Sequence, residues 1–327
     1  MRLRPLLLLV LVLALTGLAA GCGGGGGDGA SAGPAPSARP EDFPSVTGKA
    51  TLGDLIRGVR QGPQLAPGVS LLYPGAHNRF GFALIDQAGK QMNGAQVAIY
   101  TASAQQTNLR GPFPARSESL EVSPAYRSKT ASLDPDSAKA VYVADVPIAK
   151  AGRHVMIALA RLDGRLVASS AIAFQVSGGQ GGPPRVGEPA IKVDTPTRRD
   201  VRDISEIDTR IPPGTMHDAN LADVLGRKPV VLTFATPALC KSRVCGPIVD
   251  ELEELKAQSA GRAEFIHMEV YNQNKVEKGY RPQFRAWHLP SEPWTFMIAR
   301  SGRIAAEFEG PVSLDELRQG LDRAVAG

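Results

Sequence analysis

Residues 228–256 constrain this chain more than any other stretch. An apolar run from Val230 to Phe234, suited to a buried strand, leads into a short loop that carries two cysteines, Cys240 and Cys245. Apolar residues then recur at helical spacing: Ile248, Val249, Leu252 and Leu255. The sequence therefore predicts a strand, a cysteine pair and a helix in direct succession.

The start of that helix is marked by Gly246 and Pro247. Proline suits the first helical position, because the N–H that it lacks would have no partner there. Cys245 is therefore expected at or just before the helix N-terminus. Unpaired N–H groups and the helix dipole favour a thiolate at that place, and Arg243 adds positive charge nearby. Since the thiolate is the reactive form of cysteine, the pattern predicts a redox site at Cys240 and Cys245.

This arrangement resembles the active-site corner of the thioredoxin-like superfamily, with the spacing C-x4-C in place of C-x2-C. The resemblance covers residues 211–327, where Pro293 precedes an apolar strand as the cis-proline of thioredoxins does, and where Ser313 and Glu316 fit a capping box at the last helix. It implies an α/β domain in which the cysteine pair is catalytic and Pro293 lies beside the sulfurs. It also implies exchange of electrons with another thiol protein and no dissociable cofactor.

The resemblance leaves two points of mechanism open. Cys-Gly-Pro in this chain aligns Cys245 with the attacking cysteine of thioredoxin, whereas the distance from the preceding strand favours Cys240. Thioredoxins also bury an acidic side chain in that strand, and Thr233 is the nearest match here. We therefore expect no proton acceptor from the strand itself.

Other interpretations of the pair compete with redox exchange. A permanent disulfide in a non-catalytic envelope binding protein is one, although closing so small a loop contributes only about 2 kcal/mol. The site also resembles that of the Sco-type copper chaperones, in which two thiolates and a histidine bind copper, and His267 and His288 are the candidates here. A peroxiredoxin-like site fits poorly, because Thr236 and Pro237 stand in the wrong order ahead of Cys240.

The N-terminus has the features of a bacterial export signal over residues 1–21. Arg2 and Arg4 precede an apolar run, and Leu18-Ala19-Ala20-Gly21-Cys22 resembles a lipobox, which implies cleavage before Cys22 and acylation on it. The apolar run of about 16 residues is shorter than the roughly 20 that span a bilayer. We expect a lipid-anchored protein on the extracytoplasmic face of the cell membrane. Of the three cysteines, only the pair then remains for chemistry.

The remaining organisation follows from composition and strand signals. Residues 22–62 are rich in Gly, Ser and Pro and predict a flexible tether, with a short helix at its end. Residues 63–177 contain alternating apolar runs and turn signals typical of an all-β, immunoglobulin-like sandwich, and residues 178–210 form a linker. The net charge of +5 includes no dense basic run, so we expect no nucleic acid among the partners. The expected partners are envelope proteins with thiols or disulfides.

Overall fold

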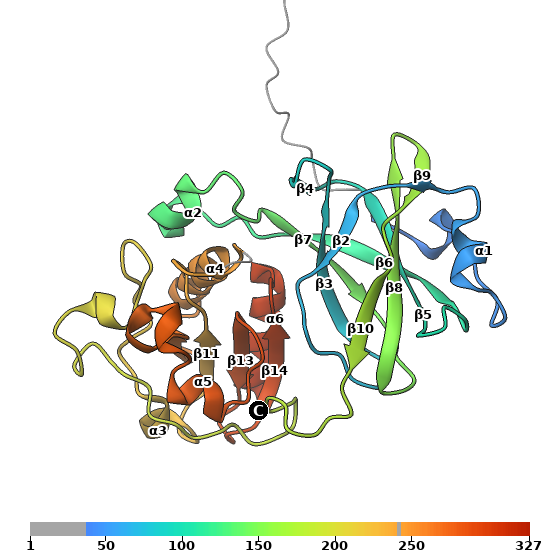
Figure 1. Ribbon diagram of the computed structural model, residues 1–327. Coiled ribbons are helices and arrows are strands. Elements are labelled where there is room, and N and C mark those ends of the chain that lie inside the picture. Colours follow the sequence, from blue (N-terminus) through green and yellow to red (C-terminus); the bar gives the residue numbers. More distant parts are fainter. Residues whose placement is uncertain (1–36, 241–242) are drawn as a thin grey trace, which may run out of the picture. The chain divides into compact units, whose positions relative to one another are not determined.

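The computed structural model describes residues 37–240 and 243–327, which belong to one compact unit containing two sheets (Figure 1). The expected signal segment 1–21 and the lipidation residue Cys22 lie outside the described residues. Among the helices described, none has the length and apolar character required to cross a bilayer.

The N-terminal sheet contains ten strands in the order β1-β9-β8-β5-β6-β7-β3-β2, with β10 paired to β8 and β4 paired to β3. All neighbours are antiparallel except β1 and β9. The all-β prediction is confirmed. Hydrogen bonds join the strands into one continuous curved sheet (Figure 1), so the two-sheet, immunoglobulin-like packing is not confirmed. The strands are β1 (Arg60–Gln61), β2 (Gln64–Pro67), β3 (Arg79–Ile85), β4 (Gln91–Met92), β5 (Gln96–Ser103), β6 (Arg110–Ser119), β7 (Ala140–Asp145), β8 (Gly152–Leu162), β9 (Arg165–Ala168) and β10 (Ile172–Val176).

Both faces of the central strands are buried, which gives this β-domain two apolar clusters. One cluster packs Phe80, Phe82 and Tyr142 among aliphatic side chains. The other face packs on residues that precede the predicted domain boundary, including Phe43 and the helix α1 (Leu52–Ile56). The apolar positions of α1 face Tyr100 and Leu159, so they are covered once the sheet forms. The described part of the predicted tether therefore belongs to the β-domain, and the folded region begins well before residue 63.

The C-terminal sheet has the order β12-β11-β13-β14, built from β11 (Val230–Phe234), β12 (Glu264–Met268), β13 (Trp294–Ile298) and β14 (Ile304–Glu309). Strands β11 and β12 are parallel, and β13 and β14 run antiparallel to their neighbours. Helices α4 (Cys245–Gln258) and α6 (Leu314–Ala326) share one apolar cluster with the sheet, whereas α3 (Leu221–Val224) and α5 (Pro282–Ala286) share the other. Helices thus cover both faces, and strand order and helix placement are those of a thioredoxin-like domain, as the sequence predicts.

The predicted linker is packed against this second sheet. Pro189 forms an isolated bridge with Arg303, and Ala190, Ile191 and Val193 contact the cluster that contains α3 and α5. Near its end, Asp208 and Arg210 are buried. Residues from about 187 onward therefore form part of the thioredoxin-like domain, because their apolar side chains cover a sheet face that would otherwise be exposed.

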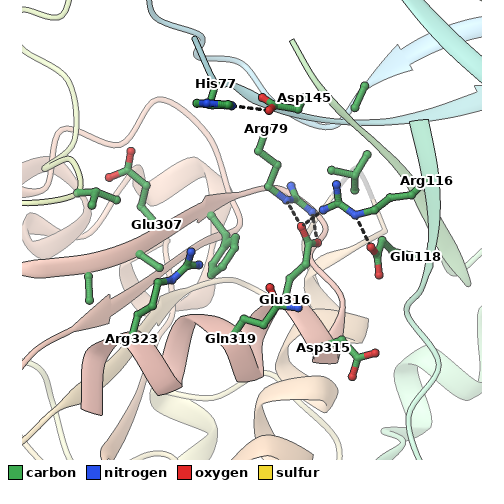
Figure 2. A pocket seen from close by; sticks show the side chains of 16 residues that line it. His77, Arg79, Arg116, Glu118, Asp145, Glu307, Asp315, Glu316, Gln319 and Arg323 are labelled. Carbon is green, nitrogen blue, oxygen red and sulfur yellow. Dashed lines mark hydrogen bonds and ion pairs between the residues drawn. The ribbon is translucent and has the colours of Figure 1, made fainter. Parts of the chain in front are cut away.

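Charged side chains connect the two sheets at a pocket of about 800 Å³ (Figure 2). Arg79 of β3 donates to both carboxylate oxygens of Glu316 on α6, at 2.9 and 2.7 Å, and Arg116 of β6 donates to the same carboxylate at 2.7 Å. Burial raises the pKa of Glu316, but its bonds to the two arginines outweigh that and lower it. Glu316 also completes the predicted capping box with Ser313, so one carboxylate starts α6 and binds the β-domain.

A segment between β6 and β7 also reaches the thioredoxin-like domain, and we call residues 120–139 the β6–β7 arm. It includes the helix α2 (Lys129–Leu133). The backbone N–H of Ser128 donates to Asp250 of α4 at 2.8 Å, and that of Ser123 donates to Glu254 at 2.9 Å. The arm therefore lies along the outer side of the helix that begins at Cys245.

Candidate active site

Cys240 and Cys245 form a disulfide, with Cα atoms 5.9 Å apart, within the usual range for such bonds. Strand β11 is buried along its whole length and ends at Phe234, and the loop that follows carries Cys240. Cys245 is the first residue of α4. The predicted succession of strand, cysteine pair and helix is therefore present.

The helix begins two residues earlier than Pro247 alone would suggest. Val244 is the N-cap, and the first helical bond runs from the N–H of Ile248 to the carbonyl of Val244, at 3.0 Å. Pro247 is the third helical residue, where the missing N–H is still one that has no acceptor inside the helix. Gly246 and Pro247 are buried in this first turn, as expected for residues that start the helix at the site.

The two sulfurs differ in exposure. Cys245 is fully buried, with 0% of its surface exposed, whereas Cys240 is half-buried. A partner sulfur can approach Cys240 more easily than Cys245. The structure thus separates two cysteines that the sequence leaves equivalent.

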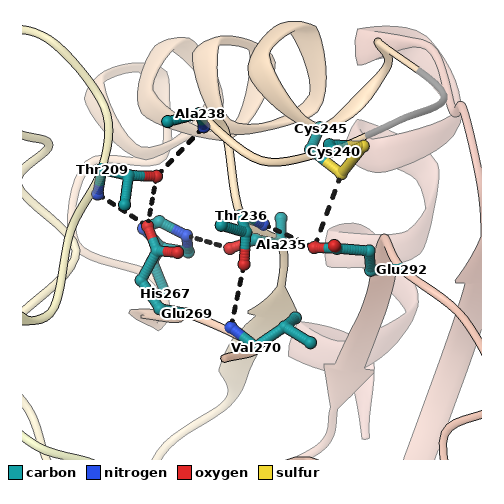
Figure 3. The surroundings of a disulfide bond; sticks show 10 residues. All are labelled: Thr209, Ala235, Thr236, Ala238, Cys240, Cys245, His267, Glu269, Val270 and Glu292. Carbon is teal, nitrogen blue, oxygen red and sulfur yellow. Dashed lines mark hydrogen bonds between the residues drawn. A yellow bond between two sulfur atoms is a disulfide. The ribbon is translucent and has the colours of Figure 1, made fainter. Parts of the chain in front are cut away.

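Glu292 supplies the acidic group that the sequence does not place at the site. Its Oε2 lies 3.8 Å from Sγ of Cys245 and accepts the backbone N–H of Thr236 at 2.7 Å (Figure 3). Burial raises the pKa of Glu292 to about 7, although hydrogen bonds from Thr236 and Tyr271 oppose the rise. A carboxyl with this pKa can both take up and release a proton near neutral pH.

Thr233 stands on β11 where thioredoxins bury an acidic side chain. Its side chain is buried, with Oγ1 3.2 Å from the carbonyl oxygen of Trp294 and 3.1 Å from Oγ1 of Thr295. This hydroxyl bonds within the sheet and supplies no carboxyl to the sulfurs. Glu292 reaches the sulfur from a segment 47 residues beyond Cys245. A glutamate directly before the proline that precedes an apolar strand is the sequence signal that could have identified it.

The peptide bond between Glu292 and Pro293 is cis, and β13 begins at the next residue. The cis bond predicted from the resemblance is therefore present. Because Glu292 is the residue before it, the proline segment lies beside Cys245. A groove of about 870 Å³ opens here, lined by Glu292, Pro293 and Val244 on one side and by residues 135–141 of the β-domain on the other.

The histidines proposed for copper do not join the sulfurs. His267 is buried on β12, where Nε2 donates to the carbonyl of Ala235 at 2.9 Å and Nδ1 lies 3.8 Å from Oδ1 of Asp208. His288 is exposed at the end of α5. In the described part of the chain, the one group of three potential metal ligands is Asp208, His217 and His267, and it contains no cysteine.

Comparisons with known proteins give only weak likenesses. No protein-family model matches the chain, and no curated protein does. A solved structure assigned as the thiol:disulfide interchange protein DsbE from Chlorobium tepidum is 16% identical, covers 43% of this chain and 99% of its own, and has a TM-score of 0.32. A second interchange protein of the thioredoxin family from Chlorobium tepidum TLS is also 16% identical over 46% of this chain and 99% of its own, with a TM-score of 0.28.

A third solved structure shows a weak likeness to part of the chain. The Lin-41 filamin domain is 11% identical over 36% of this chain and 100% of its own, with a TM-score of 0.20. These likenesses are weak, so the fold assignment depends on strand order and the site depends on its own geometry.

Proposed function

We propose that this chain is a thiol–disulfide oxidoreductase that works through Cys240 and Cys245. The observation that supports this most is the carboxyl of Glu292, 3.8 Å from Sγ of Cys245 with a pKa raised to about 7. A permanent cross-link gains nothing from a half-buried acid beside it, and placing a carboxyl there has a desolvation cost. An exchanging pair needs a group that moves a proton to and from the buried sulfur.

The difference in exposure assigns a role to each sulfur. A thiolate of a reduced partner attacks Sγ of Cys240, forms a mixed disulfide and expels Cys245 as a thiolate. Glu292 in its protonated form gives that thiolate its proton. A second partner thiolate then attacks the partner's own sulfur in the mixed disulfide and releases the Cys240 thiolate. The partner has lost two electrons, both cysteines are reduced, and the same steps in reverse oxidise them.

Pro293 and the groove beside it have a role in partner binding within this proposal. The resemblance to thioredoxins implies that the partner backbone docks next to the cis-proline. Here the opposite wall of the groove comes from residues 135–141 of the β-domain, so the partner would contact both domains. The expected partners are envelope proteins with accessible thiols or disulfides.

Membrane attachment forms part of the proposal and is supported by sequence alone. A lipid on Cys22 would hold the protein on the extracytoplasmic face of the cell membrane. Replacing Cys22 by serine should move the protein from the membrane fraction to the soluble fraction and abolish labelling with a radioactive fatty acid. Unchanged fractionation and labelling would exclude acylation at this residue.

Trapping of mixed disulfides tests the redox role directly. Cys245→Ser leaves the more accessible Cys240 with no resolving thiol, so this variant should accumulate disulfide-linked envelope proteins on non-reducing gels. Cys240→Ser is the matched control, because its remaining thiol is buried, and it should accumulate few adducts. If neither variant forms adducts, and the disulfide resists reduction at potentials of about −120 to −270 mV, the cross-link is structural.

A further inference from the structure

Three polar side chains from separate segments meet behind the cysteine loop, and they are not used by the proposed redox chemistry. Asp208 lies at the end of the predicted linker, His217 follows a loop, and His267 is on β12. All three are buried, with 1% of their surface exposed or less. One ligand atom from each lies within 4.8 Å of the other two.

The hydrogen bonds of His267 determine which ring nitrogen is available. Nε2 faces the carbonyl oxygen of Ala235 at 2.9 Å, and since a carbonyl only accepts, Nε2 carries the proton. In the neutral ring Nδ1 is then a bare lone pair, and it points at Oδ1 of Asp208 from 3.8 Å. That separation is too long for a hydrogen bond, and among the described residues Nδ1 has no partner. Two lone pairs thus face each other in a buried space.

His217 also leaves one ring nitrogen without a partner among the described residues, although its other nitrogen is bonded to Asp208. Nε2 lies 3.0 Å from Oδ2 of Asp208, and Nδ1 has no hydrogen-bond partner within the described residues. The N–H groups of Arg210 and Gly214 also donate to Asp208, at 2.8 and 2.6 Å. Asp208 thus accepts three hydrogen bonds, which favour the charged form of its carboxylate.

We propose that Asp208, His217 and His267 bind a divalent transition-metal ion of borderline softness, for which Zn²⁺ is the reference. Two imidazoles and one carboxylate are common Zn²⁺ ligands, with bonds of about 2.0–2.2 Å that place neighbouring ligand atoms about 3.4 Å apart. The separations of 3.0 and 3.8 Å found here bracket that value. A cation would neutralise the charge of Asp208 and use the lone pair of His267.

Groups around the three ligands fit the same interpretation. The bond from His267 to the Ala235 carbonyl is the kind of support that orients a metal-binding imidazole. Glu269, two residues further along the chain from His267, is 1% exposed, and its Oε2 has no partner among the described residues. The bound ion would also fix Ala235, the residue before Thr236, whose N–H binds Glu292 (Figure 3). The inference itself does not depend on the proposed redox function.

Metal binding by the full chain in its disulfide form tests the site, because the disulfide withholds both sulfurs. Equilibrium dialysis against Zn²⁺ should leave about one ion per chain. Co²⁺ should give the intense visible bands of a tetrahedral site without thiolate charge-transfer absorption. A Cys240→Ser/Cys245→Ser variant should behave identically. Wild-type protein that binds neither ion would overturn the proposal without any need for variants.

Variants then locate the site. His267→Gln keeps an N–H donor for the Ala235 carbonyl but removes Nδ1, so it should weaken Zn²⁺ binding at least about tenfold while the circular dichroism spectrum is unchanged. Asp208→Asn should do the same. The exposed histidines supply matched controls, since His77→Gln and His288→Gln should bind Zn²⁺ as the wild type does. Loss of binding in these controls, with retention in His267→Gln, would place the ion elsewhere.

Discussion

The two domains of this protein treat charge in opposite ways. Apart from Tyr100 and Tyr142, whose neutral hydroxyls are buried, the buried polar side chains in the described part of the β-domain are Thr101, Ser128 and Ser169, and none carries a charge. The thioredoxin-like domain buries acids, histidines and an arginine, including Asp208, Arg210, His217, Asp250, Glu251, Glu253, Glu254, His267, Glu269, Glu309 and Glu316. Burying such groups costs free energy unless they are paired, and perturbed ionisable groups gather at functional sites. The contrast supports placing the proposed redox chemistry in the C-terminal domain.

The buried acids of helix α4 bind neighbouring segments of the chain and so have a structural role. Asp250 binds Arg210 and the β6–β7 arm, Glu253 accepts from the N–H of Thr215 at 2.7 Å, and Glu254 holds Ser123. Together these carboxylates fix the β6–β7 arm and the loop containing Arg210 and Thr215 to the helix that begins at Cys245. The buried acids of α4 therefore position segments around the site, whereas in the proposed function the half-buried Glu292 transfers the proton there.

The largest expected effect, on the free energy of unfolding, comes from removing a buried carboxylate of α4. Asp250→Ala should lower the free energy of unfolding by about 3–5 kcal/mol, because Arg210, 6% exposed, loses its carboxylate partner while staying buried. Urea unfolding followed by tryptophan fluorescence measures this. Asp322→Ala is the matched control, since its pair with Arg262 is exposed, and it should cost about 1 kcal/mol or less. Equal losses in both variants would show that the buried acids of α4 do not hold the domain together.

The next effect concerns the reaction rate and the carboxyl of Glu292 beside Cys245. The pKa of Glu292 is raised to about 7 by burial, so its carboxylate becomes available to take the proton of Cys245 as the pH rises through 7. Oxidation of the reduced protein by glutathione disulfide should accelerate through that pH. Glu292→Gln should remove this inflection and slow the reaction at pH 8 by at least about 100-fold, the usual range for losing a general base. Stopped-flow fluorescence from pH 5.5 to 9 records it.

Glu307 is a close control for that experiment. Burial also raises its pKa to about 7, although Arg185 opposes the rise, but it lies on β14 in the charged pocket and not beside the sulfurs (Figure 2). Glu307→Gln should leave the pH profile unchanged. If the inflection survives in Glu292→Gln and disappears in Glu307→Gln, then Glu307 and not Glu292 transfers the proton, and the proposed role of Glu292 is wrong.

The features that the sequence predicts are those that depend on nearby residues in the chain. Local signals predict the cysteine pair, the helix that follows it and the capping box at Ser313, because each depends on neighbours in the chain. The cis bond before Pro293 is predicted by the resemblance to thioredoxins. Glu292 was missed, because its contact with Cys245 joins segments far apart. The described end of the predicted tether was misplaced for a similar reason: α1 is covered only by strands that follow it.

A smaller effect on stability is expected from Glu251, a buried acid that has no role in the proposed function. Glu251 is buried on α4, and neither carboxylate oxygen has a hydrogen bond of normal geometry within the described residues. Burial raises its pKa well above the ordinary value, and only a weak interaction with the N–H of Leu314 and the charge of Arg79 oppose this. The stability that depends on its neutral form is complete below pH 4.5 and is lost as the pH rises from there.

Glu251→Gln should therefore stabilise the protein at pH 8 by about 1–3 kcal/mol and change little at pH 4.5. Thermal unfolding at the two pH values measures the difference. Glu277→Gln on the surface should do nothing at either pH. Destabilisation of Glu251→Gln at pH 8 would show that the charged carboxylate has a partner that stabilises it.

The smallest expected effect lies where the two domains meet at the site. Arg243, 48% exposed, pairs with Asp134 and Asp136 of the β6–β7 arm, which are 32% and 55% exposed. Exposed pairs contribute about 0–1 kcal/mol, so Asp134→Asn/Asp136→Asn should leave the unfolding midpoint nearly unchanged. The double variant frees the Arg243 cation beside the cysteines, which should favour the thiolate and raise the reaction rate at pH 6 by a few-fold. Arg243→Gln should lower that rate instead. If both variants react as the wild type does, the arm influences the site only through its buried contacts with α4, and the ionic contact between the domains has no chemical consequence.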